Sequence, residues 1–77
     1  MPVVLRALGL RFLFYSDEGT EPPHVHVVGN GGEAKFWIRP QALAYAHGFK
    51  RQDLRRIDRA VAANLDHLNA AWDEYFA

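Results

Sequence analysis

The chain of 77 residues contains no cysteine, a single methionine and no excess of either charge. The absence of cysteine excludes disulfides and thiolate metal sites and suits a reducing cytoplasm. Nine basic and nine acidic residues cancel, so the composition does not indicate a general polyanion binder. No apolar run approaches the roughly 18 residues of a membrane span, and Arg6 and Arg11 interrupt the stretch where a signal peptide would lie. We therefore expect one cytoplasmic domain over residues 1–77, with no membrane contact.

What the chain does contain is enough apolar sequence for a core, with 49% hydrophobic and 13% aromatic residues. Residues 21–38 predict a β-hairpin: two prolines set an extended entry, two stretches alternate in polarity, and Asn30-Gly31 between them is typical of a tight turn. Counting outward from this turn pairs His24 with Trp37 and His26 with Lys35. The predicted core face is Val25, Val27, Ala34, Phe36 and Ile38. The opposite face, with His24, His26, Lys35 and Trp37, is expected to point toward solvent or a partner.

The remaining elements predict an α+β fold. Residues 3–8 and 10–15 favour two more strands that meet near Gly9. Pro40 is expected to begin a short helix that ends before Gly48, because residues 41–47 are good helix formers. From residue 51 to about residue 75, apolar residues recur every three or four positions, which predicts a helix of about 24 residues and 36 Å. The predicted architecture is an antiparallel four-stranded sheet of two hairpins, followed by a short helix and a long C-terminal helix packed on one sheet face.

Three side chains on the polar face of the hairpin have the chemistry of a metal-independent ribonuclease. His24 and His26 point to the same side of one strand, with Cα atoms about 6.5–7 Å apart. One imidazole would take a 2′-hydroxyl proton while the other protonates the leaving oxygen, because the ordinary pKa of histidine lies near neutrality. Lys35 would stabilise the developing phosphorane charge. We predict His24, His26 and Lys35 as catalytic residues.

Two other interpretations of the histidines stay open. A His-x-His pair can chelate a metal, with oxygen from Asp17, Glu18 or Glu21 in the preceding loop, but two histidines without a fixed third ligand make a poor site. We therefore expect no metal and no cofactor. In the third interpretation, the histidines form hydrogen bonds to the acidic loop and shape a binding surface.

A cluster of basic residues marks the start of the long helix. Arg51, Arg55 and Arg59 are spaced at i, i+4 and i+8 and form one helix edge, where phosphates could bind. Basic charge in the first turns of a helix opposes the helix dipole, at a cost of a few tenths to about 1 kcal/mol. The ordinary alternative is a solvated face with Asp–Arg pairs. The predicted nucleic-acid-binding residues, which include a tryptophan able to stack on a base, are Trp37, Lys50, Arg51, Arg55 and Arg59.

Several motifs give the chain a resemblance to a known family. They are Arg11-Phe12-Leu13-Phe14-Tyr15-Ser16-Asp17-Glu18-Gly19, Glu21-Pro22-Pro23-His24-Val25-His26-Val27, Glu33-Ala34-Lys35-Phe36-Trp37, Gly48-Phe49 and Trp72-Asp73-Glu74-Tyr75-Phe76. Nearly the whole chain thereby resembles the bacterial family of small proteins labelled domain of unknown function 4160. The resemblance implies a component of a toxin–antitoxin pair, often encoded beside a small protein of another uncharacterised family. It implies no established catalytic residues.

These observations lead to two functional hypotheses. The first is a toxin–antitoxin component that binds RNA, its cognate partner protein or both, with metal-independent ribonuclease activity. The second is a non-enzymatic interaction module, such as the antitoxin or a regulatory partner. The expected partners are a cognate small protein encoded nearby, RNA, and a second copy of the chain bound through the long C-terminal helix.

Overall fold

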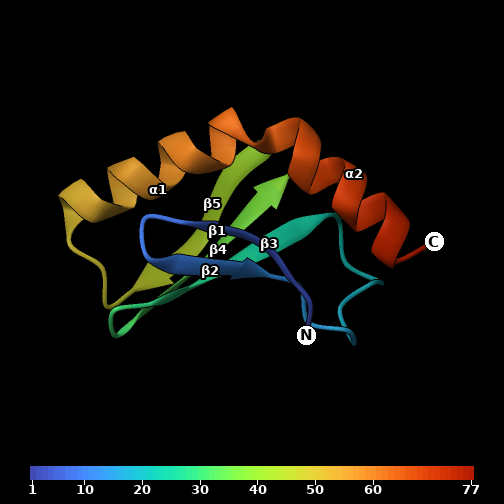
Figure 1. The fold of residues 1–77 in the computed structure, drawn as a ribbon, viewed down its shortest axis with the longest axis horizontal. Helices are drawn as coiled ribbons and strands as arrows, with labels where there is room; N and C mark the ends of the chain where they lie inside the picture. Colours follow the sequence, from blue (N-terminus) through green and yellow to red (C-terminus); the bar gives the residue numbers. More distant parts are fainter.

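The computed structural model describes residues 1–77 as a five-stranded antiparallel sheet with two helices on one face (Figure 1). The strands follow one another in the sheet in the order of the sequence. They are β1 (Val3–Ala7), β2 (Leu10–Leu13), β3 (His24–Gly29), β4 (Gly32–Ile38) and β5 (Gln41–His47). The helices are α1 (Arg51–Ala63) and α2 (Leu65–Tyr75). The predicted α+β class, with an antiparallel sheet and C-terminal helices on one face, is confirmed.

The hairpin of β3 and β4 has the predicted register. His24 lies opposite Trp37, and His26 lies opposite Lys35. The turn residues Asn30 and Gly31 have φ angles of 51° and 78°, which belong to the type I′ turn that matches the twist of a hairpin. Because successive side chains of a strand point to opposite faces, this register decides which residues enter the core.

The first hairpin is also confirmed, with Leu8 and Gly9 as its two turn residues at φ angles of 58° and 71°. The register of β1 against β2 shifts between Val3 and Leu5, which is the signature of a bulge. His67 of α2 lies with its Nε2 atom 2.7 Å from the backbone oxygen of Val4 in this bulge. The helix therefore contacts the β1 end of the sheet directly.

The predicted short helix over residues 41–47 is wrong, because these residues form strand β5. Alanine and leucine favour a helix, yet seven residues are too few for a stable isolated helix, and pairing with β4 outweighs the propensity. Arg39 and Pro40, joined by a cis peptide bond, link β4 to β5. The sheet therefore has five strands rather than four, and β5 is its second edge.

The predicted single C-terminal helix is interrupted at Asn64, whose φ and ψ angles of −115° and 18° are not helical. The Asn64 side chain donates from Nδ2 to the backbone oxygen of Ala60 at 2.8 Å and holds the bend. Figure 1 shows α1 and α2 meeting at an angle and arching over one face of the sheet. Neither helix has the length and apolar character needed to cross a membrane.

The core lies between the helices and one face of the sheet. The predicted core residues of the β3–β4 hairpin, Val25, Val27, Ala34, Phe36 and Ile38, are all buried in it. Ile57 and Val61 of α1 and Leu68 and Trp72 of α2 supply the helical side. Of the three terminal aromatic residues, Trp72 is in the core, Phe76 packs against it and Tyr75 is exposed.

Candidate functional site

His24 and His26 project from the sheet face opposite the helical core, as the register requires. The expectation that this face is open is wrong at the histidines, because their exposed fractions are 0% and 3%. The connection between β2 and β3 folds over them: Glu18 bonds both rings, and the ring of Tyr15 lies 4.4 Å from that of His26. The two predicted histidines therefore lie side by side, but the loop covers them.

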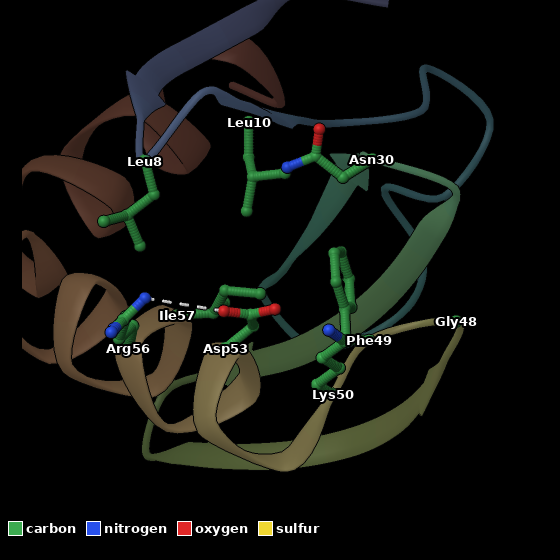
Figure 2. Close-up of a pocket in the computed structure, with 9 residues that line it drawn as sticks. All are labelled: Leu8, Leu10, Asn30, Gly48, Phe49, Lys50, Asp53, Arg56 and Ile57. Atoms are coloured by element: carbon green, nitrogen blue, oxygen red, sulfur yellow. Dashed lines mark ion pairs between the residues drawn. The ribbon is translucent and has the colours of Figure 1, made fainter.

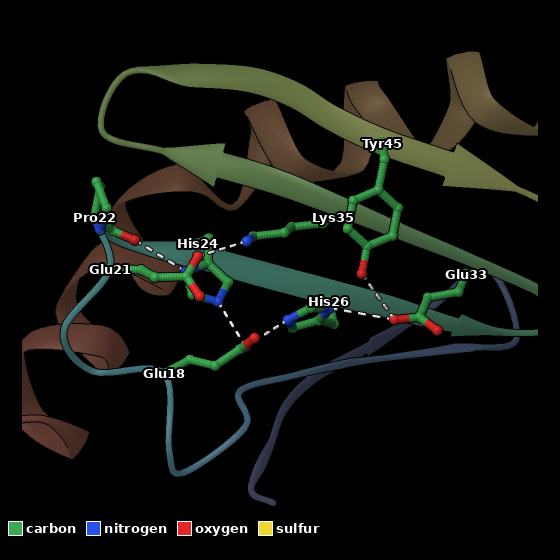
Figure 3. A network of polar contacts seen from close by, with 8 residues as sticks. All are labelled: Glu18, Glu21, Pro22, His24, His26, Glu33, Lys35 and Tyr45. Atoms are coloured by element: carbon green, nitrogen blue, oxygen red, sulfur yellow. Dashed lines mark hydrogen bonds and ion pairs between the residues drawn. The ribbon is translucent and has the colours of Figure 1, made fainter.

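One carboxylate oxygen joins the two histidines (Figure 3). Oε1 of Glu18 lies 2.8 Å from Nε2 of His24 and 2.7 Å from Nε2 of His26. Nδ1 of His24 lies 2.9 Å from the backbone oxygen of Pro22, and since a carbonyl oxygen only accepts, Nδ1 is the donor. Both ring nitrogens of His24 are thus engaged, one by the loop backbone and one by the loop carboxylate.

The second ring nitrogen of His26 is in a different situation. Its Nδ1 is buried without a hydrogen-bond partner, and Oε2 of Glu33 lies 3.4 Å away. Glu33 in turn accepts a hydrogen bond of 3.2 Å from the Tyr45 hydroxyl. The outer rim of the site therefore consists of a carboxylate and a phenol from β4 and β5.

The ionisation of the surrounding groups follows from burial and hydrogen bonding. Burial acts to raise the pKa of Glu18, but the hydrogen bonds from His24 and His26 outweigh it and lower that pKa below its ordinary value. Burial, together with the bond to Glu33, raises the pKa of Tyr45 to about 12. Burial, and then the charge of Glu33, also raises the pKa of Tyr15. At neutral pH the site thus combines an ionised carboxylate with two neutral phenols.

Lys35, the third predicted catalytic residue, lies on the same face but is engaged elsewhere. Its Nζ donates to Oε1 of Glu21 at 2.6 Å and lies 4.5 Å from the centre of the Trp37 ring. The Trp37 ring also meets the His24 ring edge-on at 5.6 Å. The catalytic role of Lys35 and the stacking role of Trp37 stay predictions, and both side chains already have intramolecular partners.

The structure places a third group suited to metal binding, Glu18, beside the two histidines. Atoms of Glu18, His24 and His26 suited to a metal lie within 4.8 Å of one another. The sequence showed three acids in the loop but gave no means to select one of them. Which acid lies beside the histidines depends on the path of the loop into β3. Pro22, which precedes this strand, accepts a hydrogen bond from His24 with its backbone oxygen.

The predicted arginine edge of the long helix is a real surface feature. Arg51, Arg55 and Arg59 lie along a groove of about 350 Å³ between α1 and β5. Phe36, Leu43 and Leu54 supply its apolar lining. The groove also contains Asp58, which accepts a hydrogen bond from Gln41. The arginines that form ion pairs within the chain are Arg39 with Asp73 and Arg56 with Asp53, so the three groove arginines have no carboxylate partner.

The other predicted nucleic-acid-binding residues lie away from this groove. Lys50 lines a separate cavity of about 450 Å³, between the two hairpin turns and the start of α1 (Figure 2). That cavity also contains Arg56, whose guanidinium lies 3.6 Å from the Asp53 carboxylate. Trp37 belongs to the histidine face. The five predicted residues are therefore divided among three places, and only the three arginines form one surface.

The family model described as Domain of unknown function (DUF4160) matches residues 9–73. The comparisons with curated proteins and with solved structures gave no match. The matched range includes β2 to β5, both helices up to Asp73, the histidine site and the arginine groove.

Proposed function

We propose that this chain, which belongs to the family Domain of unknown function (DUF4160), is the interaction module of a toxin–antitoxin pair. It binds an acidic segment of its cognate protein in the groove between α1 and β5. The observation that carries the proposal is the row of three arginines without carboxylate partners beside the exposed side chain of Leu43. The family is described as one of unknown function, so the support for this proposal comes from the groove.

The positive charge of the groove favours an anionic partner. Three guanidiniums face one carboxylate, that of Asp58, and Gln41 already donates to that carboxylate. Neighbouring guanidiniums repel one another, and a partner carboxylate between them relieves this repulsion while forming bidentate hydrogen bonds. Arginine is also among the residues that contribute most to protein interfaces.

The apolar lining of the groove favours a partner that also has apolar side chains. Leu43 is 46% exposed although it belongs to a strand, and it lies beside Leu54 in the groove. Strand β5 has β4 as its single neighbour, and no residue from Gln41 to His47 is Lys, Arg, Asp or Glu. Charged residues are a common protection of sheet edges, so an edge without them is suited to contact with another chain.

RNA is the competing partner for the same arginines. Single-stranded RNA is usually bound by aromatic side chains that stack on its bases, next to the cationic groups. The groove offers no such surface, because Phe36 is fully buried and Trp37 lies on the opposite face. The groove therefore favours a protein segment with carboxylates and an apolar anchor.

The ribonuclease hypothesis gains no support from the site geometry. A general acid or base must come within hydrogen-bond reach of the reacting proton. The Nε2 atoms of His24 and His26 are both bonded to Glu18 beneath the loop, so catalysis would require this loop to open. The catalytic triplet His24, His26 and Lys35 stays a prediction, and the interaction module is the better supported function.

The proposal is tested with the small protein encoded beside this chain, by isothermal titration of the two purified proteins. Arg51→Ala, Arg55→Ala and Arg59→Ala are each expected to weaken binding by about 5–10-fold, roughly 1–1.4 kcal/mol. The matched control is Arg6→Ala, since Arg6 is exposed on the distant strand β1 and lies outside the groove. It is expected to bind like wild type.

A parallel titration with a short single-stranded RNA separates the two partners. Binding of RNA with a log–log salt slope that falls by about 0.7 for each arginine removed, without binding of the cognate protein, would assign the groove to RNA. Equal binding by the three groove variants and wild type would show that the groove is not the interface.

A further inference from the structure

We infer that Glu18, His24 and His26 form a binding site for a divalent transition-metal ion of the zinc class, which fastens the β2–β3 connection to the sheet. The inference does not depend on the groove or on the proposed function. It rests on the convergence of three ligand atoms, on the surroundings of the outer ring nitrogens, and on the burial of the cluster.

The convergence has the composition of a metal site. Two imidazole nitrogens and one carboxylate oxygen lie within 4.8 Å of one another. Two histidines with one glutamate are a known zinc ligand set that leaves a fourth position for another ligand. With two nitrogens to one oxygen, the set suits zinc and its neighbours better than Mg²⁺ or Ca²⁺, which prefer oxygen ligands throughout.

The outer nitrogen of His24 is placed as in metal-bound histidines, and that of His26 faces a carboxylate without a hydrogen bond to it. Metal-bound histidines donate their second N–H to a carbonyl or a carboxylate, which fixes the tautomer and leaves the inner nitrogen free to coordinate. Nδ1 of His24 donates to the Pro22 carbonyl at 2.9 Å. Nδ1 of His26 lies 3.4 Å from the Glu33 carboxylate. Both rings therefore direct Nε2 toward the centre of the cluster.

The cluster is also buried. The centroids of the two imidazole rings lie 5.2 Å apart, and the two residues are 0% and 3% exposed. This burial distinguishes the cluster from histidine and acidic side chains that meet by chance on an exposed surface.

The site needs a small adjustment to receive the ion. Ligand atoms about 2.0–2.1 Å from a tetrahedral zinc ion lie roughly 3.3 Å apart, whereas Glu18 lies 2.7 and 2.8 Å from the two nitrogens. Glu18 belongs to the loop and its side chain is 24% exposed, so it can retreat by about 0.5 Å to reach that separation.

The test uses the full chain, stripped of metal with a chelator and titrated with zinc chloride. We expect one zinc ion per chain, and at a zinc concentration about 100 times Kd we expect a rise in Tm of about 10–20 °C. Magnesium and calcium chloride at the same concentration should leave Tm unchanged, because the site offers only one carboxylate.

Variants distinguish this site from adventitious surface binding. His26→Ala and Glu18→Gln are each expected to weaken zinc binding by more than about 100-fold. Glu33→Gln, which removes an outer carboxylate, should weaken it by about 10–100-fold. His47→Ala is the matched control, since His47 is an exposed histidine of β5 outside the cluster, and it should bind zinc like wild type.

The outcomes are decisive even if a histidine variant does not fold. Glu18→Gln changes one atom of a partly exposed loop residue, so it reports on the site independently of core packing. Folding of each variant is checked by circular dichroism without zinc. No zinc binding by the folded wild type, or wild-type affinity in folded Glu18→Gln, would overturn the inference. Loss of binding in His47→Ala alone would place the zinc on the surface.

Discussion

The histidine cluster and the arginine groove place charged side chains in opposite settings. In the cluster, Glu18, His24 and His26 are bonded to one another beneath a loop. In the groove, Arg51, Arg55 and Arg59 lie along an open surface without carboxylate partners. Burying a polar group destabilises the fold unless the group forms hydrogen bonds within the protein. An exposed charged side chain is hydrated by water and stays available to bind another molecule.

This difference predicts separate consequences for the two regions. Substitutions in the cluster should change the stability of the fold, because each leaves a buried group without its partner. Substitutions in the groove should change binding and leave stability nearly unaffected, because solvent already hydrates these side chains.

The largest expected effect is that of His24→Ala. The ring is fully buried, bonds Glu18 and Pro22, and packs against Trp37 and Trp72. Its removal leaves a cavity, takes the partner from the Pro22 carbonyl and takes one of two histidine partners from Glu18, which should lower the free energy of unfolding by about 2–4 kcal/mol. Urea denaturation gives the free energy of unfolding of this variant and of Arg59→Ala. The value for Arg59→Ala is expected to lie within about 0.5 kcal/mol of wild type. A loss below 1 kcal/mol for His24→Ala, roughly that of one ordinary hydrogen bond, would contradict the account.

A smaller effect is expected from acid. The folded-state pKa of Glu18 lies below its ordinary value of 4.5, so its carboxylate stabilises the fold above that pH and loses this contribution as the pH falls through the folded-state pKa. In chelator-treated buffer at pH 7, Glu18→Gln should therefore be less stable than wild type by about 1.5–3 kcal/mol. The difference should disappear in acid, and a difference independent of pH would show that the charge of Glu18 is not its cause.

The β3–β4 hairpin shows what local sequence can predict. Its turn needs φ > 0 at two adjacent positions, which Asn30 and Gly31 adopt readily, and the alternating polarity then leaves one register that buries Val25 and Phe36. All of this information lies within residues 21–38, so the sequence alone was sufficient. The same holds for the arginine edge of α1, whose spacing is a property of one helix.

The features that sequence reasoning missed depend on contacts between distant segments. Strand β5 exists because β4 pairs with it, against the helix propensity of its alanines. Its alternation of Ala42, Ala44 and Ala46 with larger residues was the available signal. The bend at Asn64 lets both helices pack over one face of the sheet.

The candidate site likewise has one feature that local sequence predicted and one that depends on contacts between distant segments. Strand alternation placed His24, His26 and Lys35 on one face, which the structure confirms. The closure of that face by Glu18 and Tyr15 depends on the path of a loop, which no periodicity describes. The burial of the histidines, and with it the shift from a catalytic to a metal-binding interpretation, could not be obtained from spacing alone.

The most direct test of the separation is to measure stability and binding on the same two variants, Glu18→Gln and Arg55→Ala. Urea denaturation gives the free energy of unfolding, and isothermal titration with the cognate protein gives Kd at a temperature where both variants are folded. We predict that Glu18→Gln loses stability and keeps wild-type affinity. We predict that Arg55→Ala keeps its stability within about 0.5 kcal/mol and binds about 5–10-fold more weakly. Lost binding in folded Glu18→Gln together with wild-type binding in Arg55→Ala would contradict the account, because it would assign partner recognition to the histidine face.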